Sequence, residues 1–249
     1  MTSSPLRETF RVHSYDADAW GLLAAPALSG WLQEAAGHHA EVLGVGVEVL
    51  MSRGLTWVLL RQRVEVERPL VLGDDVEVTT WPSGVDRLAA LRDFELRRRD
   101  GEVAARAVTQ WLVLDLASRR PVRPDRVLPG ELHTEGPHVL PAAAGRPPEL
   151  GASTLERRFS IRYRDIDRNL HVTNSSYVAW ATEAVPQEVW RTLRLRAFEV
   201  HFLAECHLGS TVLSRLSPAG HGEFLHSIVR EDDGRELARI QTSWVPRTA

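Results

Sequence analysis

The chain has 249 residues and a hydrophobic content of 43%, which is enough for one large domain or for two small domains that each bury a core. Its net charge of −3 gives no electrostatic reason to expect nucleic acid as a partner. Residues 1–10 lack the apolar run of a signal peptide, and no later stretch approaches a membrane span of about 20 apolar residues. The single cysteine, Cys206, excludes an internal disulfide and a multi-cysteine metal site, so we expect a cytoplasmic protein.

The N-terminal half predicts one long helix followed by several strands. A strand near Thr9–Tyr15 precedes a helix from about Pro26 to Leu43, in which apolar residues recur every three or four positions. Pro26 suits the first turn of this helix, and Gly44 suits its end. Alternating apolar and polar residues then predict four strands with one solvated face, at Leu55–Glu67, Asp75–Trp81, Leu88–Arg99 and Val103–Leu116. One long helix on a five-stranded antiparallel sheet makes an α+β unit.

Residues 118–153 have a different composition. They hold seven of the fourteen prolines and four glycines, so we do not expect a regular strand ladder in them. We predict an extended linker that crosses the surface. The expected boundaries are therefore 1–117 for the first unit, 118–153 for the linker and 154–249 for the second unit.

The second unit begins with a strand that leads through a polar turn into a helix. Residues 159–163 alternate apolar and polar, and Tyr177, Trp180 and Ala184 then recur at helical spacing. Thr173 or Asn174 is a good N-cap for this helix. The turn carries four polar side chains, Asp165, Asp167, Asn169 and His171. It feeds a helix N-terminus, where unpaired N–H groups favour an oxyanion.

The two units are copies of one another. At an offset of 149 residues, Phe10 matches Phe159 and Trp31 matches Trp180; at an offset of 133, the segment 99–111 matches 232–244. The matched blocks keep their order, which indicates a tandem duplication. Three positions differ in chemistry, because Trp20, Leu22 and Pro69 stand where the second copy has Asn169, His171 and Glu205.

Several separated motifs resemble those of the acyl-acyl-carrier-protein (acyl-ACP) thioesterases of plants and bacteria. The family pattern D-L-D-x-N-x-H-V-x-N-x-x-Y-x-x-W is met at residues 165–180, with Ile166 in place of Leu, and its later Glu-Cys pair is met at Glu205-Cys206. In the first half, residues 32–40 meet L-Q-E-x-x-G-x-H-A, with the histidine at His39. The resemblance covers nearly the whole chain. It implies a tandem hotdog, in which two α+β units, each a long helix on a five- to six-stranded antiparallel sheet, join as an intrachain pseudo-dimer.

The same resemblance implies hydrolysis of fatty acyl-ACP in fatty acid biosynthesis, releasing the fatty acid and the holo-carrier protein. The residues that match the family's catalytic set are Asp167, Asn169, His171 and Glu205. Asp167 would be nucleophile or general base, Asn169 would fix the carbonyl, His171 would orient the carboxylate, and Glu205 would hold or activate water. Which carboxylate attacks stays open. No cofactor and no metal ion are expected.

The duplication indicates one active site in each chain, with the first copy devoted to binding the acyl chain. Trp57 and Trp81 are candidates for its pocket walls. The implied partner is an acyl carrier protein with a phosphopantetheine-linked acyl chain, and a homodimer of chains is compatible with this reading. Because carrier proteins are acidic, six arginines near the active loop are candidate contacts: Arg162, Arg164, Arg168, Arg191, Arg194 and Arg196.

Three other functions compete with this reading. A hotdog acyl-CoA thioesterase would use the same chemistry on a different carrier. A tandem-hotdog (R)-specific enoyl hydratase uses the spacing D-x-N-x-x-H, one residue longer than the spacing here, and would leave Glu205 without a task. A non-catalytic acyl-binding module would not need the four polar residues together.

Overall fold

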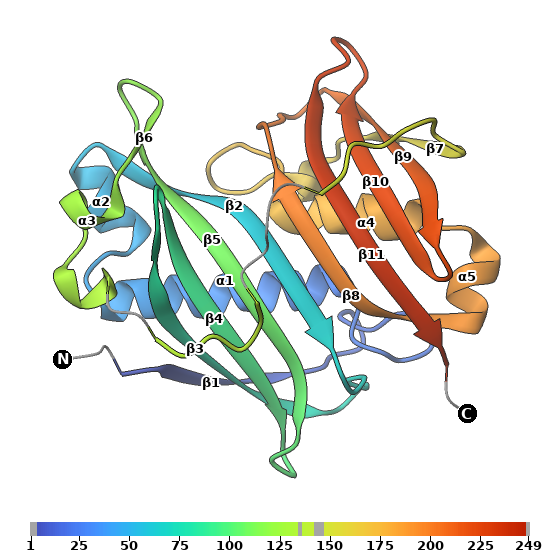
Figure 1. The fold of residues 1–249 in the computed structure, drawn as a ribbon, viewed down its shortest axis with the longest axis horizontal. Coiled ribbons are helices and arrows are strands. Elements are labelled where there is room, and N and C mark those ends of the chain that lie inside the picture. Colours follow the sequence, from blue (N-terminus) through green and yellow to red (C-terminus); the bar gives the residue numbers. More distant parts are fainter. Residues whose placement is uncertain (1–3, 134–135, 142–146, 248–249) are drawn as a thin grey trace. The chain divides into compact units, whose positions relative to one another are not determined.

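The computed structural model describes residues 4–133, 136–141 and 147–247, and the chain divides into two compact units, Met1–Ala142 and Ala143–Ala249. Within each unit, one long helix packs on one face of an antiparallel sheet (Figure 1). In the described parts of the chain, no helix is both long enough and apolar enough to cross a membrane.

The first unit is built from five long strands and one long helix. Its sheet has the order β1-β3-β4-β5-β2, with the short β6 paired to the end of β5. The bounds are β1 Leu6–Arg11, α1 Ala25–Val42, α2 Val47–Ser52, β2 Leu55–Val66, β3 Asp75–Asp86, β4 Ala89–Arg98, β5 Val103–Asp115 and β6 Arg120–Val122. The long helix and strands β2 to β5 are those that the sequence periodicity predicts, although β3 continues to Asp86, beyond its predicted end at Trp81. The periodicity does not predict the short elements α2 and β6, and the first strand begins and ends earlier than expected. Residues 12–15 leave the sheet there, because Asp16 accepts the backbone N–H of His13 and bends the chain.

The second unit repeats this order of elements. Its strands lie in the order β8-β11-β10-β9-β7, which corresponds strand for strand to β2-β5-β4-β3-β1. The bounds are β7 Leu155–Ser160, η2 Tyr163–Asp165, α4 Asn174–Ala184, α5 Gln187–Thr192, β8 Leu193–Phe202, β9 Thr211–Gly220, β10 Glu223–Arg230 and β11 Glu236–Pro246. The matching topology of the two units is what a tandem duplication produces.

The helix and the sheet of each unit meet through the same aromatic pair. Phe159 on β7 stacks with Trp180 on α4 at a centroid distance of 6.3 Å, and Trp180 is buried. In the first unit, Phe10 stacks with Trp31 at 5.2 Å. Each aromatic pair contributes about 0.5–1.5 kcal/mol of stability beyond the free energy gained by burying its apolar surface. Both units therefore use the same contact between helix and sheet.

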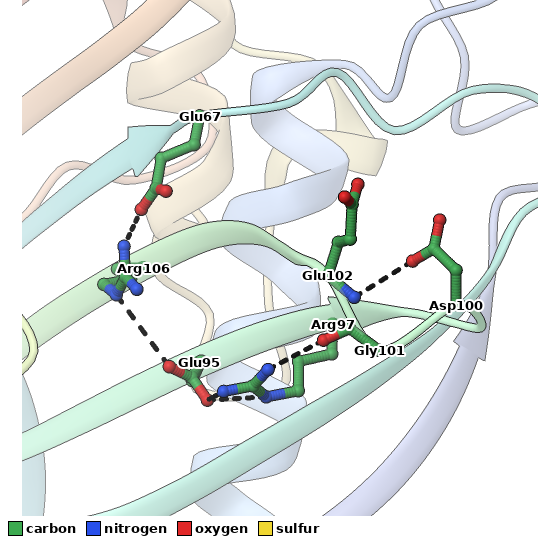
Figure 2. Close-up of polar contacts among 7 residues, drawn as sticks. All are labelled: Glu67, Glu95, Arg97, Asp100, Gly101, Glu102 and Arg106. Carbon is green, nitrogen blue, oxygen red and sulfur yellow. Dashed lines mark hydrogen bonds and ion pairs between the residues drawn. The ribbon is translucent and has the colours of Figure 1, made fainter.

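Charged residues occupy the sheet face that points away from the helix. On β4, Glu95 and Arg97 alternate with the fully buried Phe94 and Leu96, as the period of a strand requires. Figure 2 shows Arg106 of β5 between Glu67 and Glu95, with the Arg106 Nε 3.8 Å from the Glu95 carboxylate. These ion pairs are partly exposed, and pairs in contact with solvent stabilise a sheet only weakly. They mark the solvated face and do not drive folding.

The segment predicted as a linker contributes to the first unit. Besides β6, it forms α3 (Pro124–Val127) and η1 (Gly130–His133), and Leu128 and Leu132 are buried against Leu50 and Val113. These leucines have apolar surface to bury, and Pro124 at the first turn of α3 suits a helix start. The expectation of an extended linker without a ladder is therefore wrong for residues 120–133. Residues 134–135 and 142–146 of the predicted linker lie outside the described residues.

Candidate functional site

The loop between β7 and α4 is a tight turn held by Asp167. The Asp167 carboxylate accepts the backbone N–H groups of Asn169 at 2.8 Å and of His171 at 3.1 Å. The backbone closes the same turn, because Asp167 N–H donates to the His171 carbonyl at 2.8 Å. Leu170, at the tip, has a φ of +62° and an exposed side chain. One carboxylate oxygen, Oδ1, is thus committed to the shape of the loop.

The equivalent loop of the first unit has the same bonds. Asp18 accepts the backbone N–H groups of Trp20 at 2.9 Å and of Leu22 at 3.0 Å, and Asp18 N–H donates to the Leu22 carbonyl at 2.7 Å. Gly21 replaces Leu170 and has a φ of +74°. The backbone of this loop therefore does not depend on the side chains of Asn169 or His171, which the first unit replaces with Trp20 and Leu22.

Asp165 has a structural role. Its buried carboxylate accepts the backbone N–H of Arg162 at 2.7 Å and is bound by the Arg162 guanidinium at 3.1 Å. Burial opposes ionisation of Asp165, but the hydrogen bonds and the charge of Arg162 outweigh burial and keep the pKa of this carboxyl below its usual range. Arg162 is therefore committed to Asp165, which weakens its candidacy as a contact for a carrier protein.

His171 and Glu205 come together from two separate segments. Glu205 lies in the irregular stretch between β8 and β9, which is bound to the loop by Val172 N–H donating to the Cys206 carbonyl at 2.9 Å. His171 Nε2 lies 3.8 Å from Glu205 Oε2, and both side chains are about one-third exposed. A histidine beside a carboxylate in contact with solvent can accept a proton from water.

Asn169 and the start of α4 complete the polar surroundings. Asn169 is exposed, and within the described part of the chain its side chain makes no hydrogen bond. Thr173 occupies the N-cap position, as predicted, but its hydroxyl contacts the Ser175 and Ser176 hydroxyls and does not cap a backbone N–H. Thr173 is thus the N-cap residue by position, without a side-chain hydrogen bond to the helix.

His207, which the sequence motifs do not indicate, lies beside His171 and Glu205. Its ring meets the His171 ring edge-on, with a centroid distance of 4.9 Å, and its Nδ1 lies 3.3 Å from the Leu170 carbonyl. One ligand atom from each of His171, Glu205 and His207 lies within 4.8 Å of the others. The signal in the sequence is the spacing, because residues two apart on an extended segment point the same way and His207 follows Glu205 by two.

The first unit contains an apolar cavity of about 220 Å³ between α1 and its sheet. Trp57 and Trp111 line it, whereas Trp81 does not belong to its lining and donates its indole N–H to the Pro137 carbonyl. Arg92 also lines the cavity and donates to His39 Nδ1 at 2.9 Å. Burial lowers the pKa of Arg92 to about 10, and burial together with the Arg92 charge lowers the pKa of His39 to about 4. The histidine of the first-half motif is thus a buried, neutral partner of Arg92 at pH 7.

Comparison with known proteins gives two family matches that together cover most of the chain. Residues 4–128 match the model of the acyl-ACP thioesterase N-terminal domain, and residues 149–246 match that of the C-terminal domain. The chain belongs to the acyl-ACP thioesterase family. A chloroplastic acyl-[acyl-carrier-protein] hydrolase of Cuphea viscosissima is 28% identical over 98% of this chain and 63% of its own length. The dodecanoyl-[acyl-carrier-protein] hydrolase of Umbellularia californica is 29% identical over 97% of this chain and 68% of its own. The chain thus spans about two thirds of the length of these acyl-ACP thioesterases.

Solved structures of the acyl-ACP thioesterase family share the fold. The 12:0-ACP thioesterase from Umbellularia californica superposes with a TM-score of 0.88 at 27% identity, covering 98% of each chain. An acyl-ACP thioesterase from Bacteroides thetaiotaomicron gives a TM-score of 0.85 at 24% identity, covering 97% of this chain and 98% of its own. The predicted fold class is confirmed: the chain is an α+β protein with two hotdog units in tandem.

Proposed function

We propose that the chain hydrolyses the thioester bond of fatty acyl-ACP and that the reaction takes place at the loop between β7 and α4. The observation that carries the proposal is the approach of His171 Nε2 to Glu205 Oε2 at 3.8 Å, on a loop whose backbone is repeated in the first unit. The first unit has Leu22 and Pro69 at these two positions, so the fold alone does not require the pair. Membership of the acyl-ACP thioesterase family supports the choice of substrate.

The proposed reaction needs a nucleophile more than it needs an acid, because a thiolate leaves readily. His171 takes a proton from water with the Glu205 carboxylate beside it, the water oxygen bonds to the acyl carbon, and the carbon–sulfur bond breaks. The proton held by His171 then passes to the departing thiolate. The exposed amide of Asn169 supplies N–H groups for the carbonyl oxygen.

Asp167 has two tasks in this proposal. Its Oδ1 holds the loop, as the carboxylate of Asp18 does in the first unit. Its second oxygen, Oδ2, takes no part in these bonds and is available for a direct attack on the acyl carbon. Single-turnover hydrolysis in ¹⁸O-labelled water separates the two routes. If Asp167 attacks and water then cleaves the anhydride at the aspartyl carbon, the label stays in that side chain and the fatty acid carries unlabelled oxygen, whereas attack by water places the label in the fatty acid.

The cavity of the first unit is the proposed place for the acyl chain. Aromatic and aliphatic side chains dominate its lining, including Trp57, Trp111, Leu128 and Leu132, as a hydrocarbon ligand requires. Arg92 brings one buried cation to this lining, so the cavity suits a chain that ends short of the guanidinium. A Leu132→Trp variant, which fills part of the cavity, should shift the preference of the enzyme towards shorter acyl chains.

The decisive test is release of free thiol from acyl-ACP thioesters of increasing chain length, measured beside acyl-CoA hydrolysis and enoyl-CoA hydration. We expect release from acyl-ACP, and we expect His171→Ala and Glu205→Gln each to lower turnover by at least about 100-fold. Leu22→Ala is the matched control at the equivalent loop position and should keep most of the turnover. Faster turnover of acyl-CoA, hydration without hydrolysis, or acyl binding without any turnover would each contradict the proposal.

A further inference from the structure

We propose that His171, Glu205 and His207 form a binding site for a divalent transition-metal ion of the zinc type. The bound ion inhibits the hydrolysis proposed for the loop between β7 and α4. The binding stands on the geometry of the second unit. Only the inhibition rests on the proposed function.

The three side chains are held on two segments that the backbone ties together. His171 precedes Val172, whose N–H donates to the Cys206 carbonyl at 2.9 Å, and Cys206 lies between the other two ligands. One ligand atom from each side chain lies within 4.8 Å of the others, and the His171 Nε2 to Glu205 Oε2 distance is 3.8 Å. Bonds of about 2.0–2.2 Å to a tetrahedral zinc ion place ligand atoms about 3.3 Å apart. Side-chain rotations that bring the atoms closer by about 0.5 Å for the His171–Glu205 pair, and by up to about 1.5 Å for the most distant pair, therefore complete the site.

His207 is already oriented for this task. Its Nδ1 lies 3.3 Å from the Leu170 carbonyl, and the tautomer that donates this hydrogen bond keeps the lone pair on Nε2. Histidines that bind metals are commonly oriented by such a bond from the other ring nitrogen to a backbone carbonyl. The carbonyl belongs to the residue next to His171, so one loop positions both rings.

The ligand types select the kind of ion. Two imidazoles and one carboxylate are the protein ligands of several zinc sites, and they leave the fourth position to water. Imidazole also suits copper and nickel, whereas magnesium and calcium prefer oxygen ligands. In the first unit the equivalent positions hold Leu22, Pro69 and Val71, so the fold itself does not require a ligand at any of them.

An ion at this site would occupy both groups of the proposed reaction. It takes the imidazole lone pair of His171 and a carboxylate oxygen of Glu205, so neither can accept a proton from water. His207 has no task in the proposed hydrolysis, and its exposed ring can be removed without disturbing a core.

The test is calorimetric titration of Zn²⁺ into the full chain and into two variants, with Mg²⁺ as the chemical control. We expect one Zn²⁺ per chain, no heat from Mg²⁺, and Zn²⁺ binding weakened at least about tenfold in His207→Ala and in His207→Gln. His221→Ala is the matched control, because His221 is an exposed histidine in the turn between β9 and β10, and it should bind as the unaltered chain does. Equal Zn²⁺ affinity in all variants, or binding of Mg²⁺ as tight as that of Zn²⁺, would overturn the site.

Thioester hydrolysis measured with and without Zn²⁺ tests the inhibition. We expect the unaltered chain to lose activity as the site fills, and His207→Ala to need at least about tenfold more Zn²⁺ for the same fractional loss of its own metal-free activity. Inhibition that is equally strong in His207→Ala would overturn this part. If no thioester is hydrolysed at all, the proposed function fails, and the calorimetric result still decides whether the metal site exists.

Discussion

Asp18 and Asp167 make the same backbone bonds in two loops with different side-chain chemistry. Each carboxylate accepts two N–H groups, at 2.9 and 3.0 Å in the first unit and at 2.8 and 3.1 Å in the second. The aspartate of the family motif therefore has a structural role that does not depend on any role in the reaction. Because Asp18 makes the same bonds in the first unit, a comparison of variants at Asp18 and Asp167 separates the structural role from the proposed catalytic role.

Asparagine at either position should leave both loops folded, because its amide oxygen still accepts the backbone N–H groups. We expect Asp18→Asn and Asp167→Asn each to lower the free energy of unfolding by about 1 kcal/mol, since a charge-assisted bond becomes a neutral one. Only Asp167→Asn should lower turnover, by at least about 100-fold, because only that loop has His171 beside the lost charge. Urea unfolding and thiol release measure the two effects. Full activity in Asp167→Asn would restrict this residue to holding the loop.

His226 should make the second unit sensitive to acid. It is buried with its Nε2 2.9 Å from the Thr242 hydroxyl, and burial lowers its pKa to about 3, against 6.5 for a free histidine. The folded state thus keeps His226 neutral where the unfolded state takes up a proton, so stability is lost as the pH falls from 6.5 towards 3. This single group contributes a slope of up to about 1.4 kcal/mol per pH unit.

His226→Phe should flatten that slope. Phe94 occupies the matching position on β4, because Phe94 pairs with Ala107 and His226 pairs with Ile240, which are 133 residues apart (240 − 107) as the repeat requires. Urea unfolding at pH 7, 6 and 5 compares the two proteins. Identical slopes would show that His226 takes up no proton on unfolding.

At the scale of elements, the hairpin between β9 and β10 shows how a turn depends on its neighbours. Gly222 has a φ of +73°, and its carbonyl accepts the Trp244 N–H at 2.8 Å. A Cβ at this position would collide with the Trp244 carbonyl oxygen of β11. The glycine is therefore required both by its left-handed backbone and by the close approach of a third strand.

Two glycine variants separate these requirements. Gly222→Ala should lower the free energy of unfolding by about 2–4 kcal/mol, from the left-handed backbone and the collision together. Gly209 has a φ of +91° but open space around it, so Gly209→Ala should cost only about 1–2 kcal/mol. Urea unfolding of both variants gives the difference. Equal losses would mean that β11 moves aside at no measurable cost.

Across the whole chain, the two units share one topology but differ in the polar side chains at equivalent positions. The second unit has Asn169, His171 and Glu205, whereas the first has Trp20, Leu22 and Pro69 at those positions and an apolar cavity under its helix. We therefore expect one reaction site in each chain.

A count of sites tests this expectation. When excess acyl-ACP is mixed rapidly with the enzyme, the product formed before the steady state should not exceed one equivalent per chain. The His171→Ala variant should form none of this early product. Trp20→Ala in the first unit should keep the early product and change stability or chain-length preference. If His171→Ala kept about half of the turnover of the unaltered chain, a second reaction site would be present.

The duplication, the helix-on-sheet units and the loop with Asp167, Asn169 and His171 can be predicted from the amino-acid sequence alone, because repeats, periodicity and motif spacing are local properties of the chain. The sequence does not predict the structure of residues 120–133, because proline content is a local signal, whereas the burial of Leu128 and Leu132 depends on Leu50 and Val113, which are distant in the sequence. Only the tertiary structure placed Glu205 beside His171, added His207 to them and showed that Asp167 holds the loop with Oδ1. These facts depend on which side chains meet across space, and folding brings them together from segments that no sequence spacing connects.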